Sequence, residues 1–456
     1  MNPASPNKST ALGIESISSL LVKQAIPASI GILVMSLNML VDSIFVGNWI
    51  GPDALGAVGV VLPISFFVAA LGMAIGIGGS SIISRALGSN QDDRAKHTFG
   101  NMLALTVVIT SVMAVFGLLF IDTLVPAFGG KGNLFEPARV YYEIVFYGIP
   151  ILGLCMMGNN VIRAEGAPKF AMVALLIPSV GNLFLDFIFI NVMGWGMAGA
   201  AWATTVSYFL CFFYILWYFL SGKSELFPSL KHLVPAWDIL QEIGSLGFVT
   251  LARQGTSSFI FLLMNNILFD LSGEQGVTVY RIVGSLMMFA IFPVLGVTQG
   301  FLPIAGYNYG ACKWPRVSEV INLSIKVSCV LGTIIFIGLF IFTEQIAGLF
   351  TKDQSIIKQA AFAMRMVFLS VPFIAIQLIG AAYYQAIGKA MPALLLTLLR
   401  MAIVLIPLLF ILPQFYGELG VWISFPIADF IATVITAYYL WQAMKRLKDK
   451  ETVGTS

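Results

Sequence analysis

Residues 83–96 read ISRALGSNQDDRAK, and residues 303–317 read PIAGYNYGACKWPRV. Each stretch contains a glycine, Gly88 or Gly310, that is followed six residues later by an arginine, and these glycines are 222 residues apart. Self-similarity at a fixed offset is the sign of an internal duplication. The chain is therefore predicted to consist of two halves with the same fold.

A second pair of stretches supports the duplication. RAEGAPKFAM (163–172) and QAIGKAMPAL (385–394) place Gly166 and Gly388 at the same offset. Transporters often consist of two similar bundles of membrane helices, because two bundles can rock about a site that lies between them. The repeat therefore favours a transporter.

The composition is that of a membrane protein. Hydrophobic residues make up 58% of the 456 residues and charged residues only 10%, and the mean hydropathy is +0.91. Apolar runs long enough to cross about 30 Å of hydrocarbon recur along the whole chain. Lipid offers no hydrogen bonds to the backbone, so each run must be a helix. We expect twelve helices, at 21–47, 55–80, 98–121, 139–162, 170–192, 197–220, 243–271, 277–303, 318–343, 361–385, 391–413 and 419–442.

The expected fold is all-α, with two pseudo-symmetric lobes of six transmembrane helices each. The first lobe covers residues 1–220, a cytoplasmic linker follows at 221–241, and the second lobe with its basic tail covers 242–456. With the amino terminus inside, fifteen Lys and Arg residues of the loops and tails lie inside and four lie outside. The positive-inside rule then places both termini in the cytoplasm. We expect a multi-pass monomer in the inner (plasma) membrane of a bacterium.

Several function classes lack support in the sequence. We find no nucleotide-binding loop, no cluster of His and Cys at metal-ligand spacing and no soluble catalytic domain. The net charge of +3 comes from loops and does not indicate nucleic acid. We therefore predict neither an enzyme nor a nucleic-acid-binding protein, and no cofactor apart from a coupling ion. A passive channel is disfavoured because it would not need a duplicated bundle with buried acids.

Two aspartates lie deep in apolar runs of the first half. Asp42 follows Asn38 by one helical turn, and Asp186 follows Asn182 by four residues, so each pair shares a helix face. At 1.5 Å per residue, Asp42 lies about 28 Å and Asp186 about 25 Å beyond the preceding lysine, while Thr204 lies about 12 Å from the outer end of its helix. These side chains are therefore predicted to meet in the outer half of one lobe.

Acids inside a membrane are functional by default, and two of them can hold one proton between them. The structural alternatives are that Asp186 links helices, that Asp42 is solvated, and that Thr204 bonds to its own helix. Pro27, fifteen residues before Asp42, frees a backbone carbonyl and makes a bend possible. It is a candidate hinge, with a static kink as the alternative.

Together these features resemble the multidrug and toxic compound extrusion (MATE) family over nearly the whole chain, most closely its bacterial branch of the DNA-damage-inducible type. The resemblance rests on the twelve helices, the loops RALGSNQDDRAK and RAEGAPK, the aspartate late in the first helix, and the N-x-x-x-D pair followed by G-x-A-G-A-A-W-A-T. It implies a MATE-like fold and secondary active efflux of amphipathic, mostly cationic drugs by alternating access.

The resemblance also implies site residues. In proton-coupled relatives the cation site of the first lobe would correspond to Asp42, Asn182 and Asp186 here. The family further implicates Thr204, Tyr141 and Asn159, with Tyr142 and Asn160 as neighbouring alternatives for the last two. Sodium-coupled relatives carry acids in helices seven and ten, where this chain has none, so protons are favoured and sodium is the alternative.

The second half has ionic residues of its own. Arg400 and Asp429 both fall near mid-membrane, and a buried ion pair is the simplest account of them. Alternatively, Arg400 faces the substrate cavity together with Arg253 and receives an anionic group. That arrangement would suit the main rival function, a lipid-linked sugar flippase of the same superfamily, although the acidic first lobe argues against it.

Soft side chains are abundant, with 19 Met and 36 Phe, and such surfaces suit promiscuous binding of flat apolar cations. Most of them nevertheless meet lipid or pack helices. Met35 and Asn38 beside Asp42, together with Arg400, are the candidate contacts for a small-molecule substrate.

Overall fold

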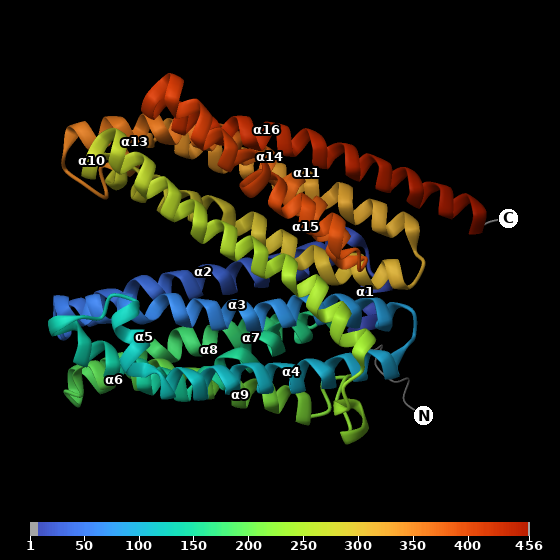
Figure 1. Ribbon diagram of the computed structural model, residues 1–456. Coiled ribbons are helices and arrows are strands. Elements are labelled where there is room, and N and C mark those ends of the chain that lie inside the picture. The colour runs from blue at the N-terminus through green and yellow to red at the C-terminus, as the bar shows by residue number, and fades with distance from the viewer. Residues whose placement is uncertain (1–7, 455–456) are drawn as a thin grey trace. The chain divides into compact units, whose positions relative to one another are not determined.

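The computed structural model describes residues 8–454, and every regular element in that range is a helix (Figure 1). Contacts divide the chain into two compact units. Unit 1 contains residues 8–14 and 30–250, and unit 2 contains residues 15–29 and 251 onward. Figure 1 shows that the long helices within each unit lie side by side.

The helices have the following bounds. The first half contains α1 (Lys8–Ile14), α2 (Ile17–Trp49), α3 (Pro52–Gly88), α4 (Asp92–Leu119), α5 (Ile121–Ala127), η1 (Gly132–Leu134), α6 (Phe135–Tyr147), α7 (Ile149–Ala164), α8 (Pro168–Asp186), η2 (Phe187–Val192), α9 (Gly196–Leu220) and η3 (Leu230–Leu233). The second half contains α10 (Trp237–Gly310), α11 (Trp314–Ile341), α12 (Thr343–Ala347), α13 (Gln354–Val367), η4 (Phe368–Ser370), α14 (Val371–Ala386), α15 (Ala390–Leu398), η5 (Leu399–Leu405) and α16 (Ile406–Gly454).

These helices account for twelve membrane spans. In the described range, nine helices are long and apolar enough to cross a bilayer, and η1, α6 and α7 form a tenth span bent by 53°. Two of the nine are double, because α10 breaks at Gly273 and α16 breaks at Gly417, where the backbone is not helical. Dividing these two helices gives twelve spans, six in each half, which confirms the predicted all-α fold.

The duplication is visible in the loops. Gly166 and Gly388 adopt φ angles of +78° and +80°, which L side chains rarely adopt. Asn90 and Cys312, again 222 residues apart, are the two non-glycine residues with positive φ in the described chain, both at 56°. The repeated sequence motifs therefore encode repeated turns.

Helices α2 and α10 each divide between the units. The beginning of α2, residues 17–29, belongs to unit 2, and the beginning of α10, up to Thr250, belongs to unit 1. Glycines permit the close approach in both places. A Cβ on Gly300 would lie 2.9 Å from the backbone nitrogen of Ala25, and a Cβ on Gly247 would lie 2.7 Å from the carbonyl of Ala74.

The segment between α9 and α10 is fastened to unit 1. The buried Asn101 side chain on α4 donates to the carbonyl of Val234 at 3.1 Å and accepts from the backbone nitrogen of Ala236 at 2.8 Å. The carboxylate of buried Glu165 accepts from the Tyr218 hydroxyl at 3.0 Å and from the backbone nitrogen of Glu225 at 2.9 Å. The predicted linker at 221–241 therefore packs as part of unit 1, and the contacts of this unit continue beyond it to residue 250.

Candidate functional site

A group of polar side chains lies inside unit 1, where four apolar helices meet. We define this polar cluster as the side chains of Asn38 and Asp42 on α2, Tyr141 on α6, Asn182 and Asp186 on α8, and Thr204 on α9. The neighbouring helices α8 and α9 pack along each other, and so do α6 and α9. The cluster therefore brings together residues that are up to 166 positions apart in the sequence, from Asn38 to Thr204.

Pro178 shapes the helix that carries two members of the cluster. Proline has no N–H, so the carbonyl of Ala174 loses its intrahelical partner. The Sγ atom of Cys211 on α9 approaches that carbonyl at 3.0 Å and takes the place of the missing donor. One residue later, the carbonyl of Ser179 accepts a hydrogen bond from Asn38 at 3.0 Å. The proline thus opens the Ala174 carbonyl to a side chain from α9, and the nearby Ser179 carbonyl accepts an additional bond from α2.

A chain of hydrogen bonds joins α2, α8 and α9. Nδ2 of Asn38 donates to Oδ1 of Asn182 at 2.9 Å, and Nδ2 of Asn182 donates to Oγ1 of Thr204 at 3.5 Å. The Tyr141 hydroxyl lies close to Thr204 and to both acids of the cluster. Each amide therefore has polar partners in an otherwise apolar region, as buried polar groups require.

The two acids lie next to each other without a counter-ion. Asp186 is fully buried at 0% exposure, and neither of its carboxylate oxygens has a hydrogen-bond partner by distance and angle. Its carboxyl group lies close to that of Asp42. Among residues 8–454, no lysine, arginine or histidine forms an ion pair with either acid. Buried charge must be paired or neutralised, so this site requires a proton or another small cation.

Asp186 also occupies a special place on its helix. It is the last residue of α8, and the chain continues directly into the π-helix η2. Single turns of π-helix occur frequently at functional sites, because they re-aim side chains within a continuous helix. The backbone therefore supports the reading of Asp186 as a functional residue.

The middle of the helix that carries Asp42 makes few buried apolar contacts in unit 1, whereas Val46 near its end is fully buried in the core of that unit. Beyond Ile30, α2 exposes large apolar side chains along much of its length, including Met35 at 39%, Leu40 at 50% and Ile44 at 56%. This helix contacts α8 through the hydrogen bonds of Asn38, through the proximity of Asp42 to Asp186, and through the packing of Gly31 against Leu175. Polar contacts thus provide much of the attachment of α2 in this region.

The structure places three predicted residues outside the polar cluster. Asn159 donates to the carbonyl of Ala171 at 2.6 Å and accepts from Arg163 at 3.1 Å. Ala171 lies fifteen residues before Asp186 on the same helix, which is about 22 Å along its axis. Asn159 is therefore not brought together with the acids. Pro27 lies buried in the part of α2 that belongs to unit 2, and Met35 is 39% exposed and makes none of the hydrogen bonds of the cluster described above.

A second polar group lies inside unit 2. Asp429 is fully buried and forms an ion pair with Nε of Arg400, whose Nη2 also donates to Oδ2 at 3.4 Å. Ser370 donates to the same Oδ2, and Gln377 donates to the backbone carbonyl of Asp429 at 2.8 Å. Arg400 belongs to the π-helix η5 and keeps 13% of its side chain exposed.

Sequence reasoning did not identify Ser370 and Gln377 as partners of Asp429. Gln377 also donates to Thr433, one turn after Asp429 on α16, at 2.9 Å. Polar residues are common in apolar helices, and their pairing depends on how each helix is rotated. Gln377 lies within the apolar run PFIAIQLIG, which predicts that its side chain is buried. Nothing in that run specifies which residue it bonds to.

Arg253 on α10 has no ion-pair partner in the described part of the chain. The predicted anion-receiving pair consists of Arg253 and Arg400, and within unit 2 Arg400 is neutralised by Asp429 whereas Arg253 is not.

Comparison with known sequences gives a consistent result. A family model described as MatE matches residues 27–188 and 251–411. A protein of Staphylococcus aureus (strain MRSA252), named Multidrug export protein MepA, is 26% identical over 433 residues, which cover 95% of this chain and 94% of that protein. A protein of the same name from Staphylococcus saprophyticus is 25% identical over 428 residues, 93% of each chain.

Solved structures agree with the family match. The fold is similar to that of a multidrug resistance MATE family transporter of the MOP superfamily in an outward-facing conformation, with a TM-score of 0.91, 26% identity and coverage of 98% of this chain and 100% of that chain. A MATE in complex with MaL6 gives the same values. A MOP superfamily transporter from Pyrococcus furiosus, described as having a binding pocket of reverse polarity, gives a TM-score of 0.90 at 26% identity with the same coverage.

Proposed function

Because this chain belongs to the MatE family, we propose that it is a secondary active transporter that exports amphipathic, mostly cationic compounds in exchange for protons. It works by alternating access, as a monomer in the inner (plasma) membrane, with both termini in the cytoplasm. The observation that carries the proposal is the pair of adjacent acids, Asp42 and Asp186, buried in unit 1 without a counter-ion.

The chemistry of the acid pair suits coupling to a cation. Two carboxylates in a low-dielectric site repel each other strongly when both are charged. A proton that binds to the pair removes this repulsion and allows the two groups to bond, whereas its loss separates them. Asp42 lies on α2 and Asp186 on α8, so the protonation state acts on the attachment between these two helices.

The surrounding hydrogen bonds favour a proton over sodium. A sodium ion needs several oxygen ligands besides the carboxylates. The oxygens of Asn182 and Thr204, the neighbouring candidates, already accept hydrogen bonds from Asn38 and Asn182. A proton needs no such ligands, so it can bind without breaking the chain of hydrogen bonds.

The sparse apolar packing along the middle of α2 supports a moving part. Its exposed portion beyond Ile30 is tied to unit 1 by the polar contacts of Asn38 and Asp42. When the acids change protonation, α2 shifts its attachment to α8, and this shift releases the substrate on the outer side. Pro27 frees a backbone carbonyl in the same helix, which makes bending there easier.

The substrate class rests on the relatives and on the acids. The staphylococcal relatives are named multidrug export proteins, and a negatively charged site attracts cations. Met35 and Asn38 lie within two turns of Asp42 and are the proposed substrate contacts. The lipid-linked sugar flippase is disfavoured, because Arg400 is paired with Asp429, although Arg253 has no ion-pair partner in the described part of the chain.

Efflux from proteoliposomes tests the proposal. The full chain is reconstituted with ethidium inside the compartment that corresponds to the cytoplasm, and a pH gradient is imposed. Wild-type efflux is expected to follow the gradient. Asp42→Asn and Asp186→Asn are expected to lose the gradient-driven component, since neither amide can exchange a proton.

Asp238→Asn serves as the matched control, because Asp238 is exposed at the start of α10. It is expected to transport like the wild type. The proton proposal fails if Asp42→Asn exports normally while folded. It also fails if wild-type efflux ignores the pH gradient and responds to a sodium gradient instead.

A further inference from the structure

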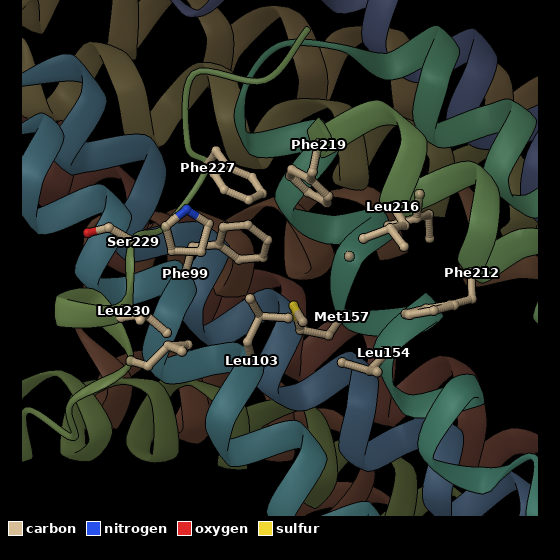
Figure 2. Close-up of a pocket in the computed structure, with 14 residues that line it drawn as sticks. Phe99, Leu103, Leu154, Met157, Phe212, Leu216, Phe219, Phe227, Ser229 and Leu230 are labelled. Carbon is tan, nitrogen blue, oxygen red and sulfur yellow. The ribbon is translucent and has the colours of Figure 1, made fainter. Parts of the chain in front are cut away.

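Unit 1 contains an apolar cavity that the transport mechanism does not use. It measures about 430 Å³ and lies between α4, α7 and α9, with the segment Phe227–Leu233 closing one end (Figure 2). Ser229 is the only residue with a polar side chain among those that line it. Figure 2 shows Leu103 and Met157 pointing toward the space from one side and Leu216 from another.

The cavity lies at the depth of one leaflet. Phe99 and Leu103 are seven and eleven residues into α4, which places them about 10 and 16 Å from the start of that helix. Phe212 and Phe219 lie within the last nine residues of α9. With the proposed orientation, this end of both helices is cytoplasmic, so the cavity lies within the inner leaflet.

Apolar side chains at the rim are exposed rather than packed. Leu230 is 85% exposed, Phe227 is 54% exposed and Leu216 is 37% exposed. Exposed side chains on two sides of an apolar hollow leave it open to an apolar guest. An acyl chain can fill such a hollow by packing against its apolar lining, and because the chain is equally apolar in the bilayer, preference for one lipid must come from the head group.

Positive charge lies at the cytoplasmic end of the cavity. Lys96 precedes Phe99 by three residues and Leu103 by seven, so all three lie on one face of α4. No ion pair involves Lys96 in the part of the chain that the structure describes. Lys231, next to Leu230 on the closing segment, is 68% exposed and its one ion pair is with Asp93, which is 74% exposed. Such an exposed pair is weak and leaves the lysine available.

We propose that this cavity binds an anionic phospholipid of the inner leaflet, with an acyl chain among α4, α7 and α9 and the phosphate at Lys96 and Lys231. The lining contains no acid to hold a cation, so it suits a lipid better than a cationic exported compound. The bound lipid contacts Phe227 and Leu230 and so holds the segment between α9 and α10 against unit 1. This inference rests on the proposed orientation, but not on the coupling ion or the substrate.

Thermal unfolding of the full chain in detergent tests the proposal. Dioleoyl phosphatidylglycerol and dioleoyl phosphatidylcholine, which share the same acyl chains, are titrated separately, and the rise in the unfolding midpoint gives the affinity of each. A lysine near the membrane surface contributes enough to favour an anionic lipid about fivefold. Wild type is therefore expected to bind phosphatidylglycerol at least that much more tightly than phosphatidylcholine.

Two variants distinguish binding of the acyl chain from binding of the lipid head group. Leu216→Trp fills the cavity and is expected to abolish the response to both lipids, whereas Leu210→Trp, on another face of α9, is expected to retain it. Lys96→Gln is expected to keep the response to phosphatidylcholine and to lose about fivefold in affinity for phosphatidylglycerol. Lys169→Gln, an exposed lysine on α8 outside the cavity, is expected to behave like wild type.

The proposal is overturned if wild type responds equally to both lipids, or if Leu216→Trp and Leu210→Trp respond alike. It is also overturned if ethidium, and not phosphatidylglycerol, raises the midpoint in a manner that Leu216→Trp removes. Should Leu216→Trp fail to fold, the comparison of Lys96→Gln with Lys169→Gln still decides. None of these readouts measures transport, so failure of the lipid site and failure of the proton antiport are distinguishable.

Discussion

Replacing Arg400 by methionine removes the positive partner of a buried ion pair while keeping an apolar side chain of similar length. Asp429 is fully buried, and without Arg400 its carboxylate would keep the bond from Ser370 and lose the one ion-pair partner that it has among residues 8–454. Breaking a buried pair in this way costs about 3–5 kcal/mol, because an uncompensated charge is left in a low-dielectric site. We expect Arg400→Met to destabilise unit 2 by about 4 kcal/mol.

Replacing Asp429 instead of Arg400 should lower the free energy of unfolding by less, and replacing both residues should lower it least. Arg400 keeps 13% of its side chain exposed, so Asp429→Leu leaves a guanidinium that still reaches some solvent. Its expected cost is about 3 kcal/mol. Removing both charges restores an apolar interior, and the Ser370 hydroxyl keeps its bond to the carbonyl of Val367 at 3.2 Å. The double variant is therefore expected to lie within about 1 kcal/mol of wild type.

The assay is thermal unfolding of the purified chain, followed by tryptophan fluorescence. Trp422 is 1% exposed in the core of unit 2 and reports on that unit. For a unit of this size, 4 kcal/mol corresponds to a fall in the midpoint of about 12 °C. Arg365→Met is the matched control. Its pair with Glu344 is 3.7 Å long and exposed on both sides, so its loss should cost less than about 1 kcal/mol.

Two results would refute this reasoning. If Arg400→Met and Arg365→Met shift the midpoint equally, the buried pair does not stabilise unit 2 as its burial indicates. If the double variant is as unstable as the sum of the single variants, the two residues act independently. A loss of transport in Arg400→Met below its unfolding temperature would instead support the alternative that Arg400 receives a substrate group.

Two further predictions concern other parts of unit 1. Gly247→Ala places a methyl group 2.7 Å from the carbonyl of Ala74 and is expected to destabilise the protein by about 1–3 kcal/mol in thermal unfolding. Gly244→Ala on the same helix is the control, because a methyl group there meets nothing within 4 Å, and it should be neutral or stabilising. Burial raises the pKa of the Glu165 carboxyl from 4.5 to about 7, so the folded state holds a proton that the unfolded state releases, and stability should fall as the pH rises from 4.5 to 7, by on the order of 3 kcal/mol. Glu165→Gln should flatten this dependence in unfolding midpoints taken between pH 5 and 8, and an unchanged slope in the variant would contradict the assignment.

The sequence predicts the acid pair well because depth in a membrane helix can be counted. Asp42, Asp186 and Thr204 were expected in the outer half of one lobe, and the structure brings them together. The same count would have placed Asn159, four residues before Arg163, near the loop end of its helix. The family resemblance grouped it with the acids, and the structure pairs it with Arg163 and Ala171 instead.

Contacts that depend on helix rotation and packing could not be predicted. The periodicity of an apolar run does not tell which neighbour a polar residue faces, so Ser370 and Gln377 were not linked to Asp429. The sequence predicts the boundary between the two lobes at the polar segment 221–241, where the connecting loop lies. The contacts of the folded chain place the boundaries inside α2 and α10 instead.

The division of α2 and α10 has a consequence for the origin of the fold. Each half of the chain lends the opening turns of its first long helix to the other half, namely residues 17–29 of α2 and residues 237–250 of α10. A single half expressed alone would therefore lack part of its own interior and would expose the surface that receives the missing turns. An ancestor with one copy of the repeat could have completed itself only by pairing with a second molecule through a mutual exchange of helices. Gene fusion would then have joined two partners that were already intertwined, and the polar segment after α9 marks the seam.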